Sequence, residues 1–137
     1  MRGPSPSLHG HGTSRVVRQL SQFRYRLRLF LRFSERAARA AGVTPQQHQL
    51  MLGVAGFTGR GWATISELAE CLQERHNAVV TLVNRASRAK LVRKRTLARD
   101  RRFVCVELTP AGRTILTKLS ALHQRELARF ELRKTFV

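Results

Sequence analysis

A dense run of positive charge near the centre of the chain constrains its fold most. The ten residues from Arg93 to Arg102 carry six lysines and arginines and one carboxylate. An apolar helical pattern ends just before this run, and a strand alternation from Phe103 to Leu108 follows it. Charge runs are usually solvated tails, but this one is enclosed by two ordered elements. The pattern therefore predicts a basic hairpin that projects from a folded body, a shape suited to gripping nucleic-acid phosphate.

The overall charge points in the same direction. The chain has 137 residues, enough for one domain with a modest core, and a formal net charge of +18. Like charges repel one another in a compact state, so an excess of this size calls for a partner that neutralises it. Nucleic acid is the first candidate, an anionic membrane surface the second and an acidic protein the third. No apolar run approaches membrane-spanning length, so we expect no membrane insertion.

The chain divides into a leader and one folded domain. Residues 1–13 are rich in Gly, Pro, Ser and His, so they are predicted to be a flexible leader rather than a secretion signal. Residues 14–137 form the predicted domain. The two cysteines, Cys71 and Cys105, lack metal-ligand spacing. We therefore expect reduced thiols in a cytoplasmic, nucleoid-associated protein.

The segment 15–41 has the three- and four-residue apolar spacing of a long helix, which Gly42 ends. Tyr25, Leu29 and Phe33 extend its apolar surface beyond one stripe. A helix that is apolar on more than one face is buried on more than one side, so a second copy of the chain is expected to cover it. The remaining positions are arginines, most of which we assign to solubility and to packing of their aliphatic stems. They are Arg15, Arg18, Arg24, Arg26, Arg28, Arg32, Arg36 and Arg39.

A capping motif marks the start of the next helix. Thr44 can cap it, Pro45 suits its first turn, and Gln47 can complete a capping box. Residues 57–61 are interpreted as a turn and residues 62–64 as a short strand.

Two further helices follow at close spacing. Thr64 and Glu67 predict a second capping box, which opens a short helix ending at Leu72. Another helix is expected from His76 or Asn77. A helix, a short turn and a second helix make a helix-turn-helix, the arrangement in which the second helix enters the DNA major groove.

The basic run and its flanking strands then form the predicted wing. Leu91 and Val92 lead into it, and Phe103 to Leu108 lead out of it as a half-buried strand. Thr109 and Pro110 are expected to cap a final helix.

The segment from Leu68 to Gly112 resembles the MarR (multiple-antibiotic-resistance regulator) family of bacterial transcription factors. Short motifs carry the resemblance together, in order and without gaps. They are Leu68-Ala69-Glu70, then Val79, Leu82, Val83, Arg85 and Leu91-Val92, then Asp100-Arg101-Arg102 and Leu108-Thr109-Pro110-Ala111-Gly112, together with Thr44-Pro45-Gln46-Gln47 upstream. The long first helix also fits, so the resemblance covers nearly everything after the leader.

The resemblance implies a mainly α fold with a small β wing. Residues 44–108 would form the winged helix-turn-helix lobe, and residues 14–42 and 110–137 the dimerisation helices. It also implies a homodimer that binds a pseudo-palindromic operator on double-stranded DNA and usually represses. A small-molecule effector pocket between the dimer helices and the DNA-binding lobe is a further expectation.

This chain departs from the family pattern at four places. Lys90 replaces a usual Gly, and Arg75 replaces a small capping residue, so Asn77 is expected to cap the recognition helix instead. Asp100 is interpreted as the wing's single acid. The final helix ends at Val137, sooner than the family's pair of C-terminal helices.

The polar face of the recognition helix is the predicted reader of DNA. Asn can bond the edge of adenine bidentately, and Val or Thr methyls can meet a thymine methyl, whereas Arg is expected to hold phosphate. The candidate residues are His76, Asn77, Val80, Thr81, Asn84, Arg85 and Arg88.

The wing supplies the second set of predicted DNA contacts. A narrow minor groove concentrates negative potential, which attracts inserted arginine. The candidates are Lys94, Arg95, Arg99, Arg101 and Arg102, with Asp100 structuring the loop by pairing with Arg102 or another arginine.

Other reactive side chains carry weaker signals. Cys105, next to the wing, is the better candidate for sensing oxidants, although a buried inert thiol is the commoner role for cysteine. The five histidines show no metal spacing, so we expect no metal and no cofactor. Core packing is the expected role of most of the aromatic residues that could instead line an effector pocket, namely Phe23, Tyr25, Phe30, Phe33 and Trp62. Nothing in the sequence pairs a nucleophile with a base, so we expect no enzyme.

Two functions from different classes stay open at this stage. The first is a sequence-specific, dimeric transcriptional regulator. The second is an architectural protein that coats nucleic acid by charge without reading bases, and the arginine-rich wing and weakly capped recognition helix favour it. The ratio of affinities for operator and random duplex separates the two hypotheses.

Overall fold

The structure is a computed structural model that describes Gly12, residues 14–97 and residues 100–130. Its elements are mainly helices, with strands after η1 and after α4. In chain order they are α1 (Arg15–Ala40), α2 (Pro45–Leu52), the π-helix η1 (Gly53–Phe57), β1 (Trp62–Thr64), α3 (Ile65–Leu72), α4 (His76–Arg88), β2 (Val92–Leu97), β3 (Asp100–Leu108) and α5 (Pro110–Phe130).

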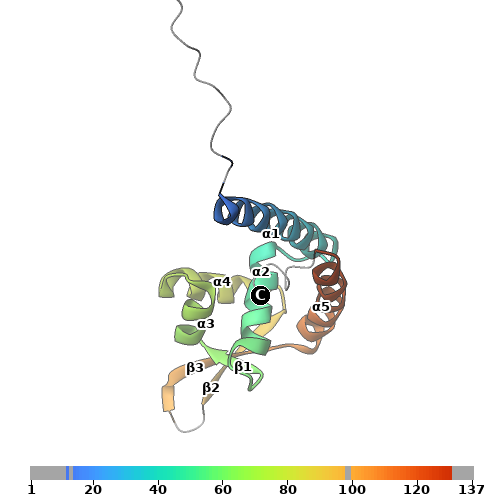
Figure 1. The fold of residues 1–137 in the computed structure, drawn as a ribbon. Helices are drawn as coiled ribbons and strands as arrows, with labels where there is room; N and C mark the ends of the chain where they lie inside the picture. Colours follow the sequence, from blue (N-terminus) through green and yellow to red (C-terminus); the bar gives the residue numbers. More distant parts are fainter. Residues whose placement is uncertain (1–11, 13, 98–99, 131–137) are drawn as a thin grey trace, which may run out of the picture.

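The elements form a small lobe with two long helices packed along it (Figure 1). Helices α1 and α5 contact each other and both contact α2, which lies at the centre. Helices α3 and α4 pack against α2 on the other side, and the three-stranded antiparallel sheet has the order β1-β3-β2. The hairpin of β2 and β3 projects at the end of the molecule remote from α1.

Both predicted capping boxes are confirmed. The Thr44 hydroxyl accepts from the Gln47 amide at 3.0 Å, and the Gln47 side chain accepts from the Thr44 amide at 3.0 Å. Thr64 and Glu67 make the same reciprocal pair at 3.2 and 3.0 Å. Each pair satisfies two backbone N–H groups that the first turn of a helix leaves without partners.

The turn predicted at residues 57–61 is confirmed at residues 58–61, because the π-helix Gly53–Phe57 continues one residue further than expected. One local prediction is wrong. Asn77 does not cap α4. The helix already begins at His76, and the capping position belongs to Arg75, whose side chain makes no capping hydrogen bond.

The core joins the helices to the sheet. Fully buried side chains come from α2, α3, α4, β3 and α5, including Leu50, Leu68, Val83, Val106 and Leu119. The expected alternation of β3 fails at one position, because Cys105 is 7% exposed although its neighbour Val106 is also buried. The Sγ atom of Cys105 lies 3.3 Å from the Arg95 carbonyl of the neighbouring strand β2.

A histidine pair lies where α1, α2 and α5 meet. His48 is 2% exposed, and its ring centroid is 4.7 Å from that of His123. The Nδ1 atom of His123 donates to the Leu119 carbonyl at 2.6 Å, and its Nε2 atom lies 2.8 Å from the Ser34 hydroxyl. A carbonyl only accepts, so neutral His123 carries its proton on Nδ1 and accepts from Ser34 at Nε2.

This pair predicts acid sensitivity. Burial, followed by the neighbouring His123, lowers the pKa of His48 to about 4 from 6.5. The unfolded chain therefore binds a proton below pH 6.5 that the folded chain binds only near pH 4. The contribution to stability is complete above pH 6.5, and about 3 kcal/mol is lost as the pH falls to 4.

Urea unfolding at pH 7.5 and pH 4.5 measures this effect. His48→Leu should flatten the dependence of the unfolding free energy on pH, whereas His76→Leu on the exposed surface should leave it unchanged. An equally steep dependence in His48→Leu and the wild type would contradict the assignment.

Candidate nucleic-acid interface

Helix α4 is anchored by one apolar face and presents the opposite face to solvent. Val79, Val83 and Ala86 are buried against the core. The predicted reading residues fall into two groups. His76, Asn77, Thr81, Arg85 and Arg88 are exposed, whereas Val80 and Asn84 are half-buried.

Within α4, the hydroxyl of Thr81 donates to the Asn77 carbonyl one turn back, at 3.1 Å. This bond fixes the side-chain rotamer, so the methyl group of Thr81 has a defined direction on the exposed face. Gln73, in the left-handed region with φ of 51°, turns the chain between α3 and α4. The first turn of α4 has no side-chain cap, so its backbone N–H groups can donate hydrogen bonds to an anion such as phosphate.

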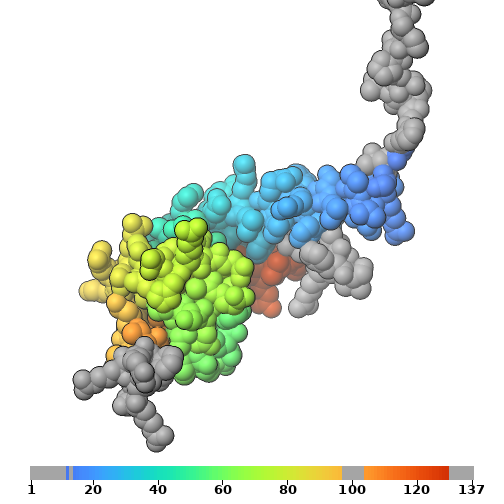
Figure 2. All heavy atoms as spheres, turned by 90° about the vertical axis from the view of Figure 1, so that its left-hand side faces the viewer, coloured from blue at the N-terminus to red at the C-terminus, as the bar shows by residue number. Residues whose placement is uncertain are grey.

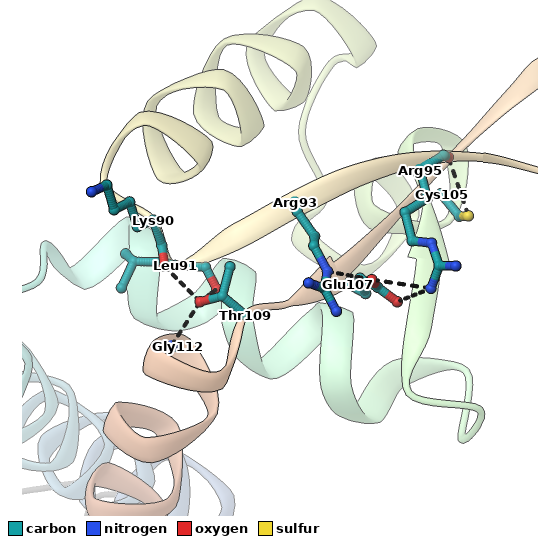
Figure 3. Close-up of polar contacts among 8 residues, drawn as sticks. All are labelled: Lys90, Leu91, Arg93, Arg95, Cys105, Glu107, Thr109 and Gly112. Carbon is teal, nitrogen blue, oxygen red and sulfur yellow. Dashed lines mark hydrogen bonds and ion pairs between the residues drawn. The ribbon is translucent and has the colours of Figure 1, made fainter.

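The base of the wing contains an acid that the sequence analysis overlooked. Glu107 on β3 lies opposite Arg93 on β2, and its carboxylate accepts from both Arg93 and Arg95 (Figure 3). The Arg93 hydrogen bond, followed by that of Arg95, holds the pKa of Glu107 below its usual range. Asp100 is therefore not the only acid of the hairpin, and Arg95 is tied to the hairpin rather than free.

Lys94 points to the other side of β2 from Arg93 and Arg95. Its Nζ atom donates to the Oδ1 atom of Asn84 at 2.6 Å, which joins the wing to the recognition helix. In this arrangement the Asn84 carbonyl oxygen is occupied, and its NH₂ group remains as a donor. Asn84 therefore does not stand ready for the bidentate adenine contact that the sequence suggested.

The structure describes the tip of the wing only in part. Arg99 is outside the described residues. The backbones of Asp100, Arg101 and Arg102 belong to β3, but their side chains are not among those described. The roles predicted for these four residues stay predictions.

The wing is joined to α5 by a tight backbone crossing. Lys90 adopts a left-handed conformation with φ of 62°, where the resemblance leads one to expect Gly. The Thr109 amide donates to the Leu91 carbonyl at 3.0 Å, and the Thr109 hydroxyl accepts from the Gly112 amide at 3.0 Å (Figure 3). Thr109 thus caps α5, as predicted, and holds its start against the strand that leads into the wing.

The aromatic residues predicted to line an effector pocket do not gather in one place. Phe30 and Phe33 pack edge-on against His123, with centroid distances of 5.7 and 5.4 Å. Trp62 lies on β1, beneath the Arg60 guanidinium at 3.7 Å. Tyr25 is exposed. The packing role expected for most of these residues is confirmed for Phe30 and Phe33, and the effector pocket stays a prediction.

Neither cysteine has the surroundings of a reactive thiol. Burial raises the pKa of the Cys71 thiol, which disfavours the thiolate. Cys105 is buried and its Sγ donates to the Arg95 carbonyl at 3.3 Å. Among the described residues no three histidines, cysteines or carboxylates gather as metal ligands, and no helix is long and apolar enough to cross a membrane.

The space-filling view shows α3 and α4 side by side on one face, with the described hairpin strands below them (Figure 2). A helix-turn-helix followed by a β-hairpin that packs beside its second helix defines a winged-helix fold. The model of the MarR family matches residues 41–102, which span α2 to the wing. Over these residues the chain is similar to the MarR family, and the solved structures that it resembles include MarR family transcriptional regulators.

Three solved structures illustrate the likeness. A MarR family transcription regulator is 27% identical, with a TM-score of 0.72 over 84% of this chain and 74% of that one. A mutant MarR from E. coli, complexed with operator DNA, is 19% identical, with a TM-score of 0.67 over 87% and 82%. BpsR from Bordetella bronchiseptica, whose DNA binding is regulated by 6-hydroxynicotinic acid, is 17% identical, with a TM-score of 0.63 over 85% and 84%. No curated protein sequence matches the chain.

Proposed function

We propose that the protein is a sequence-specific, homodimeric transcriptional regulator that represses from a pseudo-palindromic operator on double-stranded DNA. The observation that carries the proposal is the pairing of two surfaces on one side of the lobe. The exposed polar face of α4 lies beside the basic hairpin of β2 and β3, and Lys94 joins the two directly. The E. coli MarR of the same fold was solved with operator DNA.

The side chains of α4 divide naturally between base reading and phosphate binding. Asn77 and Thr81 are exposed at its N-terminal half, where recognition helices enter the major groove. Asn offers a donor and an acceptor to adenine, and the Thr methyl can meet thymine. Arg85 and Arg88 lie towards the C-terminal end and suit phosphate, which positions the helix without specifying sequence.

A homodimer accounts for apolar side chains that one copy leaves in water. Leu20 and Leu31 on α1 are 58% and 44% exposed, and Leu122 and Leu127 on α5 are 40% and 43% exposed. Burying a large side chain stabilises an assembly by roughly 1.5 to 3 kcal/mol. A second copy that covers these two helices would also place two recognition helices on one operator.

Release by a small molecule is part of the proposal, and BpsR is a relative whose DNA binding such a compound regulates. A groove of about 320 Å³ separates α2 from α4. Gln46, Gln49 and Arg85 line it around apolar side chains such as Leu82. A bound molecule there would touch the recognition helix and compete with its phosphate contacts.

The test compares affinities for two duplexes. An operator is first selected from a randomised duplex library, and binding to it and to random duplex is measured. Asn77→Ala and Thr81→Ala should each weaken operator binding by about 1 to 3 kcal/mol and leave random-duplex binding almost unchanged, because only base contacts carry sequence.

Thr114→Ala is the matched control for Thr81→Ala. Its hydroxyl makes the same bond to the carbonyl four residues back, at 3.1 Å, but on α5. It should leave both affinities unchanged. If neither α4 variant alters the ratio of operator to random-duplex affinity, the protein is an architectural coater and the proposal fails.

A further inference from the structure

Six arginines of α1 form a continuous surface that the proposed operator contacts do not use. We call this surface, defined by the six residues, the α1 arginine stripe. At 100° per residue they fall within about a third of the helix circumference, and all six are exposed. They are Arg18, Arg24, Arg28, Arg32, Arg36 and Arg39.

Among the described residues, no carboxylate forms an ion pair with an arginine of the stripe. The ion pairs found there join carboxylates to Arg60, Arg93, Arg95 and Arg129. The single acid of the helix is Glu35, which can offset at most one of the six charges. Like charges four residues apart destabilise a helix, so the series from Arg24 to Arg36 opposes α1 unless an external anion screens it.

The stripe also faces away from the winged helix. The opposite face of α1, with Phe30 and the buried Ala38, packs towards α5 and α2. In Figures 1 and 2 α1 runs along the end of the molecule remote from the described strands of the wing. A straight duplex held by α4 and the wing therefore leaves the stripe free to meet a second segment of duplex.

The composition of the stripe favours nucleic acid over other anions. Every cation of α1 is an arginine, whose planar guanidinium binds phosphate oxygens in pairs. A duplex presents one negative charge per about 1.7 Å of its axis, so one helix can meet several at once. A membrane-surface helix instead inserts an apolar face between lipids. On α1, Phe30 and Ala38 pack towards α5 and α2, and the exposed Leu20 and Leu31 are the side chains that the proposed second copy covers.

We propose that the α1 arginine stripe is a second phosphate-binding surface for double-stranded DNA, through which the protein bridges two duplex segments. The first segment is held by α4 and the wing. The inference therefore rests on the proposed function, which assigns DNA binding to these two elements. The second segment is held through its phosphates, which carry no sequence information.

Energy transfer between two random-sequence duplexes, one carrying a donor dye and the other an acceptor, tests the proposal at low salt. Anisotropy of one duplex alone measures the single-duplex affinity, which distinguishes a loss of bridging from a general loss of DNA binding. The wild type should give energy transfer. Arg28→Gln/Arg32→Gln/Arg36→Gln should lower bridging at least about tenfold, while single-duplex affinity falls only a few-fold.

The matched control removes the same charge from α5. Arg113→Gln/Lys118→Gln/Arg125→Gln alters three exposed cations on α5 and should still bridge. An equal loss of bridging in both triple variants, or full bridging in both, overturns the proposal.

Two results with the wild type would also overturn it. In the first, the wild type binds one duplex but gives no energy transfer between two. In the second, the stripe binds phosphatidylglycerol vesicles and no second duplex. Absence of any duplex binding would instead refute the proposed function, and the inference with it. Circular dichroism confirms folding, since glutamine is as good a helix former as arginine.

Discussion

DNA binding is expected to weaken by roughly a thousandfold or more when salt rises from about 50 mM to about 200 mM. Each phosphate that a lysine or arginine neutralises releases condensed counterions, and added salt opposes that release. Each subunit offers Arg85, Arg88 and Lys94 on the described surface of α4 and β2, and a dimer doubles the number. Fluorescence anisotropy of a labelled duplex, measured across this range, provides the slope of log affinity against log salt.

Substitution of single cations shows which surface of the protein is responsible for the slope of log affinity against log salt. Arg85→Gln should make the slope shallower by about one for each phosphate that is no longer neutralised. Arg113→Gln removes the same charge from an exposed position on α5 and should leave the slope unchanged. If the affinity of the wild type for DNA hardly changes with salt concentration, neither α4 nor the wing binds phosphate as proposed.

Replacing Gly112 by alanine should severely destabilise the fold. A Cβ atom at this position would lie 2.1 Å from the Leu91 carbonyl oxygen and 3.0 Å from its carbon. That oxygen cannot simply move aside, because it accepts the hydrogen bond from the Thr109 amide. The start of α5 and the base of the wing would have to separate, at an expected loss of about 3 kcal/mol or more in the free energy of unfolding.

Urea denaturation measures the free energies of unfolding of Gly112→Ala and of Gly56→Ala, which serves as the control. Gly56 also lies in a helical segment, but a Cβ there meets nothing within 4 Å. Gly56→Ala should be neutral or stabilising by up to about 1 kcal/mol, because alanine restricts the unfolded chain. Equal stability of the two variants would show that the crossing of Leu91 and Gly112 is not tight in solution.

Features that depend on neighbours in the chain were predictable from the sequence. The capping boxes at Thr44 and Thr64 and the cap at Thr109 are all confirmed, because each joins residues three positions apart. The periodic apolar residues likewise marked α1 and α4 to within a residue or so. The failure at Asn77 is also local. Asparagine is a good cap, but α4 begins at His76, one residue before Asn77, and its cap position is Arg75.

The geometry of the candidate site depended on contacts that no local pattern records. Glu107 neutralises Arg93 across 14 residues, and Lys94 reaches Asn84 across 10. Both follow from strand register and from the packing of the hairpin beside α4. Sequence alone counted these side chains as independent charges, whereas the fold makes them one connected surface.

The division between sequence and tertiary structure has one physical reason. Charge, capping and apolar periodicity act over one or two turns, so by themselves they determined the helices, the basic hairpin and the winged-helix class of this protein. Burial and pairing arise only when distant segments meet. Tertiary structure therefore decided that His48 and His123 share a buried junction, that Cys105 is covered, and that the α1 arginine stripe lies opposite the face of α1 that packs on α2 and α5.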